Sequence, residues 1–197
     1  MFRIHRIVAL LCLAAGMPLL QATENAIRAG VQVAALVPTS PDLKLTTGSP
    51  GVGAGFHLDI PVREGLLIRP RLEVQFFSAG DQHSQDVSLD QTLKTRVRSL
   101  GIGADVLTTL PGLPHSLQFG LSVQELRWQV ASVNTVRVAG GSSEVSGTST
   151  WWRFAWGPLV SVRVNEHCEL EARLSLSRYG QENQLANTAA LGVLWHF

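Results

Sequence analysis

At two places in the sequence, a histidine or a serine lies close to residues of other types that could take part in catalysis. Acyl transfer by a side-chain nucleophile needs a Ser or Cys, a histidine base within hydrogen-bonding reach, and a carboxylate that orients the imidazole. His57 and Asp59 supply a base and a carboxylate, but the sequence places no Ser or Cys beside them. The segment "SLSRYG" supplies Ser175 and Ser177 without a histidine. Neither place therefore predicts a complete catalytic set.

A third place contains all three residue types, at His83 and Ser84 with Asp81 or Asp86. These residues are close neighbours in a polar segment, whereas a triad needs side chains that converge from positions held by a rigid scaffold. We therefore predict that the chain has no catalytic residues and is not an enzyme.

The histidines and cysteines do not have the spacing of a metal site. His167 and Cys168 are an adjacent pair at a turn, whereas zinc sites draw on ligands spaced a few residues apart. The stretch "GVGAG" is not a dinucleotide-binding loop, because no helical pattern follows it. The sequence thus predicts neither a metal nor a cofactor. The histidines beyond the N-terminal segment are scattered, at positions 57, 83, 115, 167 and 196.

The first 22 residues have the three-part pattern of a secretory signal peptide. An arginine-bearing start precedes an apolar run, and a Leu-Gln-Ala tripeptide predicts cleavage after Ala22. The predicted organisation is a signal peptide at 1–22 and one domain at 23–197. That domain keeps 14 basic and 15 acidic residues, so its charge gives no reason to expect nucleic-acid binding. Cys168 is then the single cysteine, which excludes an intrachain disulfide.

After the signal peptide, apolar and polar residues alternate with a period of two, which predicts β-strands with one apolar face. In "GVGAGFHLDI", Val52, Phe56 and Leu58 share one face, and His57 and Asp59 share the other. Strands of about ten residues are long enough to cross a bilayer when tilted. Eight such strands are predicted, at about 27–37, 51–60, 66–77, 94–107, 116–129, 151–164, 168–180 and 188–197.

The alternation slips in two of these strands. One slip lies between Val97 and Leu100, and the other between Val123 and Leu126. A β-bulge, or the passage of the strand into a loop, is the expected cause.

The connections between the predicted strands alternate between long and short. The longest are rich in Gly, Ser, Thr, Asn and Asp and have no packing pattern, which predicts mobile loops. Long loops of transmembrane barrels are extracellular and short turns are periplasmic. The long connections are 38–50, 78–92, 131–150 and 181–187, and the short ones are 61–65, 110–115 and 165–167.

Alternation alone fits both a soluble barrel with an apolar interior and an outer-membrane barrel with a polar interior. The polar faces combine glycine with long charged side chains. Glycine weakens an exposed strand, whereas inside a narrow barrel it leaves room for an arginine from another wall. A polar interior is therefore predicted. The residues assigned to it are Gly30, Gly53, Gly55, Gly101, Gly103, Gly120, Gly157, Gly192, Arg28, Arg69, Arg71, Arg153, Arg163, Arg173, Asp59, Glu73, Asp105, Glu169 and Glu171.

Hairpin folding places opposite charges side by side on this polar face. For His57, we expect a hydrogen bond in the lumen to Arg69 or Glu73. The predicted neighbours are Arg163 with Glu169 and Glu171, and Arg69 with His57 and Asp59.

Aromatic residues gather towards the strand ends, as in the two girdles of a transmembrane barrel. Trp156 lies deeper, and a girdle does not account for it. The girdle residues are Trp151, Trp152, Phe76 and Phe77 on the long-loop side, with Trp195 and Phe197 on the short-turn side.

Over nearly all of 23–197, the chain resembles the small bacterial outer-membrane β-barrels of the OmpA/OmpX type, also described as the porin-family outer-membrane β-barrel domain. The most specific motif is the final strand, whose apolar face carries Leu191, Val193, Trp195 and Phe197. The resemblance implies an all-β, eight-stranded, antiparallel up-and-down transmembrane barrel in the bacterial outer membrane, with both termini periplasmic. The last strand is expected to close the barrel against the first.

The resemblance also implies partners and a set of possible functions. The partners are outer-membrane lipid and lipopolysaccharide, the barrel-assembly machinery, which would read the C-terminal strand, and an unidentified extracellular ligand of the loops. The leading hypothesis is a non-catalytic barrel with a charged, plugged lumen and a structural, adhesive or surface-protective role. The alternatives are a narrow porin-like channel for small solutes and a lipid A-modifying enzyme. A soluble ligand-binding barrel is a further hypothesis, which the alternation of apolar and polar residues leaves open. A barrel-type lipid A deacylase would be expected to show His-x-Ser, and the matching "SLSRYG" has no histidine.

Overall fold

The computed structural model describes residues 27–47, 50–86, 89–110, 112–114, 116–138, 141–180 and 184–197. The predicted signal peptide at 1–22 lies outside these residues. Among the residues described, no helix is long and apolar enough to cross a membrane. The elements are β1 (Arg28–Pro38), α2 (Pro41–Thr47), β2 (Gly51–Arg63), β3 (Leu66–Phe77), β4 (Gly80–Asp86), β5 (Leu89–Thr108), β6 (Leu117–Val138), β7 (Gly141–Arg163), β8 (Cys168–Ser175), β9 (Arg178–Tyr179), β10 (Gln184–Leu185) and β11 (Thr188–His196).

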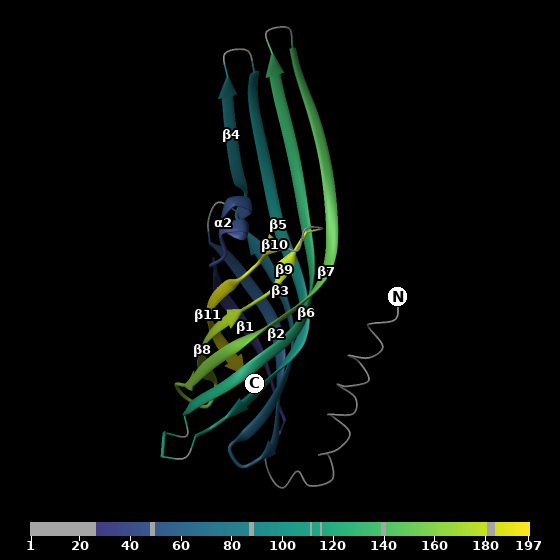
Figure 1. The fold of residues 1–197 in the computed structure, drawn as a ribbon. Coiled ribbons are helices and arrows are strands. Elements are labelled where there is room, and N and C mark those ends of the chain that lie inside the picture. Colours follow the sequence, from purple (N-terminus) through teal and green to yellow (C-terminus); the bar gives the residue numbers. More distant parts are fainter. Residues whose placement is uncertain are drawn as a thin grey trace.

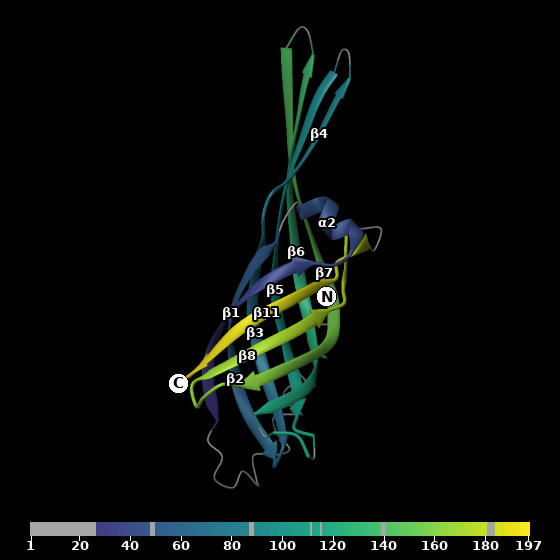
Figure 2. The same cartoon turned by 90° about the vertical axis from the view of Figure 1, so that its left-hand side faces the viewer.

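Eight of these strands form a closed antiparallel ring, in the order β1, β2, β3, β5, β6, β7, β8 and β11 (Figures 1 and 2). Each strand pairs with the next ring strand along the chain, which is the predicted up-and-down topology. The last strand closes on the first, with Val33 paired to Val193 in the middle of the seam. Closure leaves no unpaired edge within the ring.

The apolar faces of the strands point outward and the polar faces point inward. Val33, Phe56 and Leu191 are each more than 60% exposed, whereas Gln32 and His57, which alternate with them along β1 and β2, are at most 5% exposed. This is the reverse of a soluble barrel, whose interior is apolar. The prediction of a polar interior is therefore confirmed.

The two slips in the alternation do not mark bulges. Val97 and Leu126 both point inward and are at most 2% exposed, and β5 pairs with β6 in one unbroken register from Asp90 to Thr108. The pattern slips because the interior of the barrel changes from polar to apolar at the level of these two residues. The bulge prediction was therefore wrong. These two residues belong to an apolar cluster, here called the upper cluster: Leu36, Leu43, Phe77, Val97, Leu126, Trp128, Ala155, Tyr179 and Ala186.

Helix α2 lies at the end of the ring that carries the upper cluster (Figure 2). Leu43 of the helix is fully buried in that cluster. The phenol of Tyr179 lies 2.5 Å from the hydroxyl of Thr46 and donates to the backbone oxygen of Asp42 at 3.2 Å. Burial raises the pKa of Tyr179, so the phenol keeps the proton that it donates. The predicted loop at 38–50 is therefore partly helical and is anchored to the barrel.

Two of the predicted long loops, 78–92 and 131–150, are mostly strand. They form a four-stranded continuation of the sheet, here called the extension, which rises beyond the ring (Figure 1). Outside the ring a strand needs no apolar face, so a mostly polar sequence can still form a hairpin through its backbone hydrogen bonds. That is why the prediction of loops was wrong. The extension consists of β4, residues 89–95 of β5, 132–138 of β6 and 141–147 of β7.

The aromatic girdles are largely as predicted. Phe76 and Trp152 on one side, and Trp195 and Phe197 on the other, point outward and are at least 44% exposed. Phe77 is the exception, because it points inward and belongs to the upper cluster. Trp151 also packs partly against that cluster.

Candidate functional site: the charged lumen

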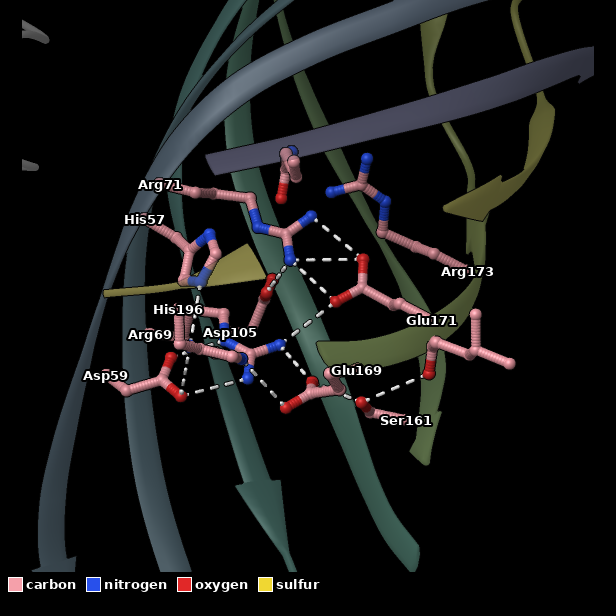
Figure 3. Close-up of polar contacts among 12 residues, drawn as sticks. His57, Asp59, Arg69, Arg71, Asp105, Ser161, Glu169, Glu171, Arg173 and His196 are labelled. Carbon is pink, nitrogen blue, oxygen red and sulfur yellow. Dashed lines mark hydrogen bonds and ion pairs between the residues drawn. The ribbon is translucent and has the colours of Figure 1, made fainter. Parts of the chain in front are cut away.

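The middle of the barrel holds eight charged side chains that are each at most 5% exposed. Most lie at every second position of β3 and β8, because alternate residues of a strand share one face. Both strands thus contribute three charged groups, and β2 and β5 contribute one each. This lumen network consists of Arg69, Arg71, Arg173, Asp59, Glu73, Asp105, Glu169 and Glu171, and Figure 3 labels all of them except Glu73.

Arg69 links three strands. Its Nε donates to Oδ1 of Asp59 at 2.6 Å, which is the neighbour that hairpin folding predicted. Its Nη1 lies 2.7 Å from Oε1 of Glu169 and 3.2 Å from Oε2 of Glu171, both on β8. The side chain therefore reaches from β3 across the lumen to the opposite wall.

Arg71 and Arg173 extend the network in the same way. Arg71 Nη2 lies 2.8 Å from Oε2 of Glu171 and also pairs with Asp105 of β5. Arg173 of β8 donates to Oε2 of Glu73 on β3 at 2.5 Å, and Glu73 also accepts from the side-chain amide of Gln75 at 2.9 Å. Buried charges are stable when they are paired and hydrogen-bonded, and each of these acids faces an arginine.

Three arginines assigned to the polar face lie outside the buried network. Arg28 is exposed at the start of β1, and Arg153 is half-buried, where it donates to the backbone oxygen of Gly180 at 2.6 Å. Arg163 is also half-buried and is paired in register with Glu169, as predicted. The ion pair of Glu169, however, is with Arg69.

The inward glycines leave room for the charged groups. A Cβ at Gly53 would lie 3.1 Å from Oε1 of Glu73, and a Cβ at Gly30 would lie 2.5 Å from Nε2 of His57. A side chain at Gly30 would therefore displace His57, and one at Gly53 would require Glu73 to shift by a few tenths of an ångström. This is the packing role that the sequence predicted for glycine on the polar face.

His57 does not make the predicted hydrogen bond to Arg69 or Glu73. Its Nε2 instead lies 3.4 Å from Nδ1 of His196, a residue 139 positions away in the chain. Both histidines are register partners of Gly30, one on each side of β1. Sequence reasoning missed this pair because it depends on the register of β1 with both neighbours. The sequence signal that would have found it is an inward glycine on the first strand, with an inward histidine at the paired position of each adjacent strand.

His57, His196 and Asp59 are all buried, and one donor atom of each lies within 4.8 Å of the others. Imidazole nitrogens and carboxylate oxygens are common metal ligands. The sequence had treated the histidines as scattered, and the structure brings two of them together.

The serine and histidine candidates for catalysis do not converge among the described residues. His83 and Ser84 are adjacent in β4, so their side chains point to opposite faces of the strand. Ser175 accepts from the amide of Gln124 at 3.5 Å, and Ser177 donates to the backbone oxygen of Phe154 at 3.2 Å. Ser175 thus contacts β6 and Ser177 contacts β7.

His167 lies at the turn before β8, and Cys168 is the first residue of β8. The ring of His167 stacks on Trp195 at 5.7 Å, and its Nδ1 lies 3.1 Å from the backbone oxygen of His196. The backbone N–H of Cys168 donates to the side chain of Asn165 at 2.8 Å. These contacts shape the turn.

No protein-family model matches the chain, and no curated protein matches its sequence. Solved structures do match. A major outer membrane protein from Thermus thermophilus aligns with a TM-score of 0.55 at 12% identity, over 88% of this chain and 100% of that one. The N-terminal β-barrel domain of Pseudomonas aeruginosa OprF aligns at 0.48 and 15% identity, over 86% and 97%. Neisserial surface protein A aligns at 0.44 and 14% identity, over 87% and 97%. The chain therefore has the fold of small bacterial outer-membrane β-barrels.

Proposed function

We propose that this protein is an integral outer-membrane barrel with a closed lumen, which serves a structural or adhesive role at the bacterial surface without catalysis. The observation that carries the proposal is the lumen network, whose ion pairs join β3 to β8 across the barrel. The membrane location, the closed lumen and the role of the extension are supported by separate features.

The outer surface supports a location in lipid. Large apolar side chains cover the outside of the ring, including Val33, Phe56 and Leu191, and an exposed apolar band of this kind is stable in a bilayer and unstable in water. The start of β1 and the end of the chain lie at the end of the ring away from the extension (Figure 1). Since long hairpins of such barrels are extracellular, this arrangement supports periplasmic termini.

The filling of the lumen supports a closed barrel. The network lies between the upper cluster and a smaller apolar cluster of Leu67, Leu107 and Leu159, which lies on the turn side of Arg69 and Asp105 along β3 and β5. A permeating ion would have to separate pairs such as Arg69 and Glu169, both fully buried. Removing one partner of a buried ion pair costs about 3–5 kcal/mol, so these charges depend on their partners and passage through the resting barrel is disfavoured.

The extension supports a role at the surface. Strand β7 has 23 residues, and a tilted strand crosses a bilayer in about ten, so about 13 residues, or about 43 Å of strand at 3.3 Å per residue, extend outside the bilayer. Within the described chain, β4 pairs with β5 on one side, and residues 141–147 of β7 pair with β6 on one side. Such strand edges can add a strand from another protein, which is one way for a surface protein to bind.

The purified protein, refolded and added to planar lipid bilayers, is expected to produce no discrete conductance steps. The reason is that the lumen network and both apolar clusters occupy the path through the ring. A known porin, refolded and tested in the same bilayers, controls for insertion and sensitivity. Reproducible single-channel steps from this protein would contradict the proposal and support a narrow channel.

A further inference from the structure

We propose that His57, Asp59 and His196 bind a divalent transition-metal ion inside the barrel, and that zinc fits the site best. The three side chains come from β2 and β11, which lie on either side of β1. The site is separate from the proposed role of the extension, and it does not depend on whether the lumen conducts.

The spacing of the donor atoms matches a tetrahedral ion. His57 Nε2 lies 3.4 Å from His196 Nδ1, and His196 Nδ1 lies 3.7 Å from Oδ2 of Asp59. Around a zinc ion with bonds of about 2.0–2.2 Å, two ligand atoms are about 3.3–3.5 Å apart. The rings of the two histidines are nearly perpendicular, at 80°, and the nitrogens that face each other are Nε2 of His57 and Nδ1 of His196. The donor atoms of all three residues lie within 4.8 Å of one another, so a shift of Asp59 towards His57 would complete three ligands and leave a fourth position for water.

The residues around the three ligands are arranged as in typical metal sites of proteins. Ligating histidines usually present their second nitrogen to a carboxylate, and ligating carboxylates accept further hydrogen bonds. Nε2 of His196 lies 3.4 Å from Oε2 of Glu169. Arg69 donates to both oxygens of Asp59, at 2.6 and 3.2 Å (Figure 3). Glu169 therefore faces Nε2 of His196 while Nδ1 of the same ring faces His57, and Arg69 binds the carboxylate of Asp59.

The charge of the lumen favours a cation. Among the nearly buried side chains there are five carboxylates and three arginines. Arg153 and Arg163 of the polar face are only half-buried, so negative charge is in excess among the enclosed groups. Uncompensated charge in a buried site is costly. An ion of charge +2 held by neutral histidines supplies positive charge where the imbalance lies.

The site lies where a bound ion would stabilise the closed barrel. His57 and His196 meet over Gly30, where a Cβ would lie 2.5 Å from Nε2 of His57. A bound ion would connect β2 to β11 across β1 and so brace the seam at which the barrel closes. Zinc has no redox chemistry and accepts nitrogen and oxygen ligands, so it suits this role.

The test is the metal content of the folded protein. The chain is refolded in detergent with zinc, freed of unbound ion by gel filtration, and analysed by inductively coupled plasma mass spectrometry. About one zinc per chain is expected, and His57→Gln and His196→Gln are each expected to reduce the content at least about tenfold. His83→Gln, which removes an exposed histidine of β4, is the matched control and should retain the wild-type content.

Folding of each variant is checked by its change in gel mobility on heating. If a histidine variant does not fold, the wild-type protein still decides the question. Refolded with cobalt, it should show the visible absorption bands of a tetrahedral ion, and its zinc X-ray absorption spectrum should show imidazole scattering. A folded wild-type protein without stoichiometric metal would overturn the proposal. So would zinc that remains at the wild-type content in folded His57→Gln and His196→Gln.

Discussion

Replacing Arg69 with methionine is expected to lower the free energy of unfolding by about 3–5 kcal/mol, as for other broken buried ion pairs. Arg69 is fully buried and pairs with Asp59, Glu169 and Glu171. Methionine fills similar volume but leaves these carboxylates with less positive charge in a site that water does not reach. The loss can be measured by denaturant titration of the protein refolded into lipid vesicles, with tryptophan fluorescence as the signal.

Arg63→Met is the matched control, because Arg63 is exposed at the end of β2. Its effect is expected to stay within about 0.5 kcal/mol. Adding Asp59→Asn to Arg69→Met should recover part of the loss, because it removes one of the unpaired carboxylates. An Arg69→Met variant as stable as Arg63→Met would contradict a stabilising network.

Replacing Trp128 with alanine is expected to cost about 3–5 kcal/mol of unfolding free energy, which is typical of truncating a buried aromatic side chain. Trp128 is fully buried and stacks on Phe77 at 6.0 Å between ring centroids, and its ring lies 6.2 Å from that of Tyr179. Its loss would leave a cavity in the upper cluster beneath α2. The same denaturant titration measures the effect.

Two variants separate packing at Trp128 from general effects of removing tryptophan. Trp152→Ala removes an outward tryptophan, 44% exposed, and should cost less. Trp128→Phe should also cost less, because it keeps an aromatic ring in the stack and removes an indole N–H that has no hydrogen-bond partner among the described residues. Equal losses for Trp128→Ala and Trp152→Ala would argue against a packed upper cluster.

The direction of each side chain could be predicted because the period of two is local to each strand. "GVGAGFHLDI" places Phe56 and Leu58 on one face and His57 on the other, whatever the rest of the chain does. Glycine on the polar face then indicated which face was inward. The Arg69–Asp59 pair was also predictable, since a short turn sets its register.

The upper cluster and the extension could not be predicted in the same way. Val97 and Leu126 are apolar residues on an inward face, so in the sequence they look like a break in the pattern. The extension has no apolar face, and its composition is that of a loop. Periodicity detects a strand by the difference between two environments, and that difference is missing in the extension.

Contacts across the lumen depend on how the ring closes, which no single hairpin determines. Arg69 reaches Glu169 and Glu171 because β3 and β8 face each other in the closed barrel. His57 and His196 meet because β1 aligns both with Gly30. Assigning strands in the sequence does not determine these registers. The sequence therefore predicted the charged lumen but not the contacts between residues of distant strands.

The most direct test of the central claim compares two tryptophans in vesicles whose lipids carry brominated acyl chains. The claim is that the apolar faces contact lipid and the opposite faces fill the lumen. Each variant keeps one of the five tryptophans, either Trp156, which is 48% exposed on the outer face, or Trp128, which is fully buried, with the others changed to phenylalanine. Bromine should quench Trp156 strongly and Trp128 weakly. Stronger quenching of Trp128 than of Trp156, or quenching of neither, would contradict the account.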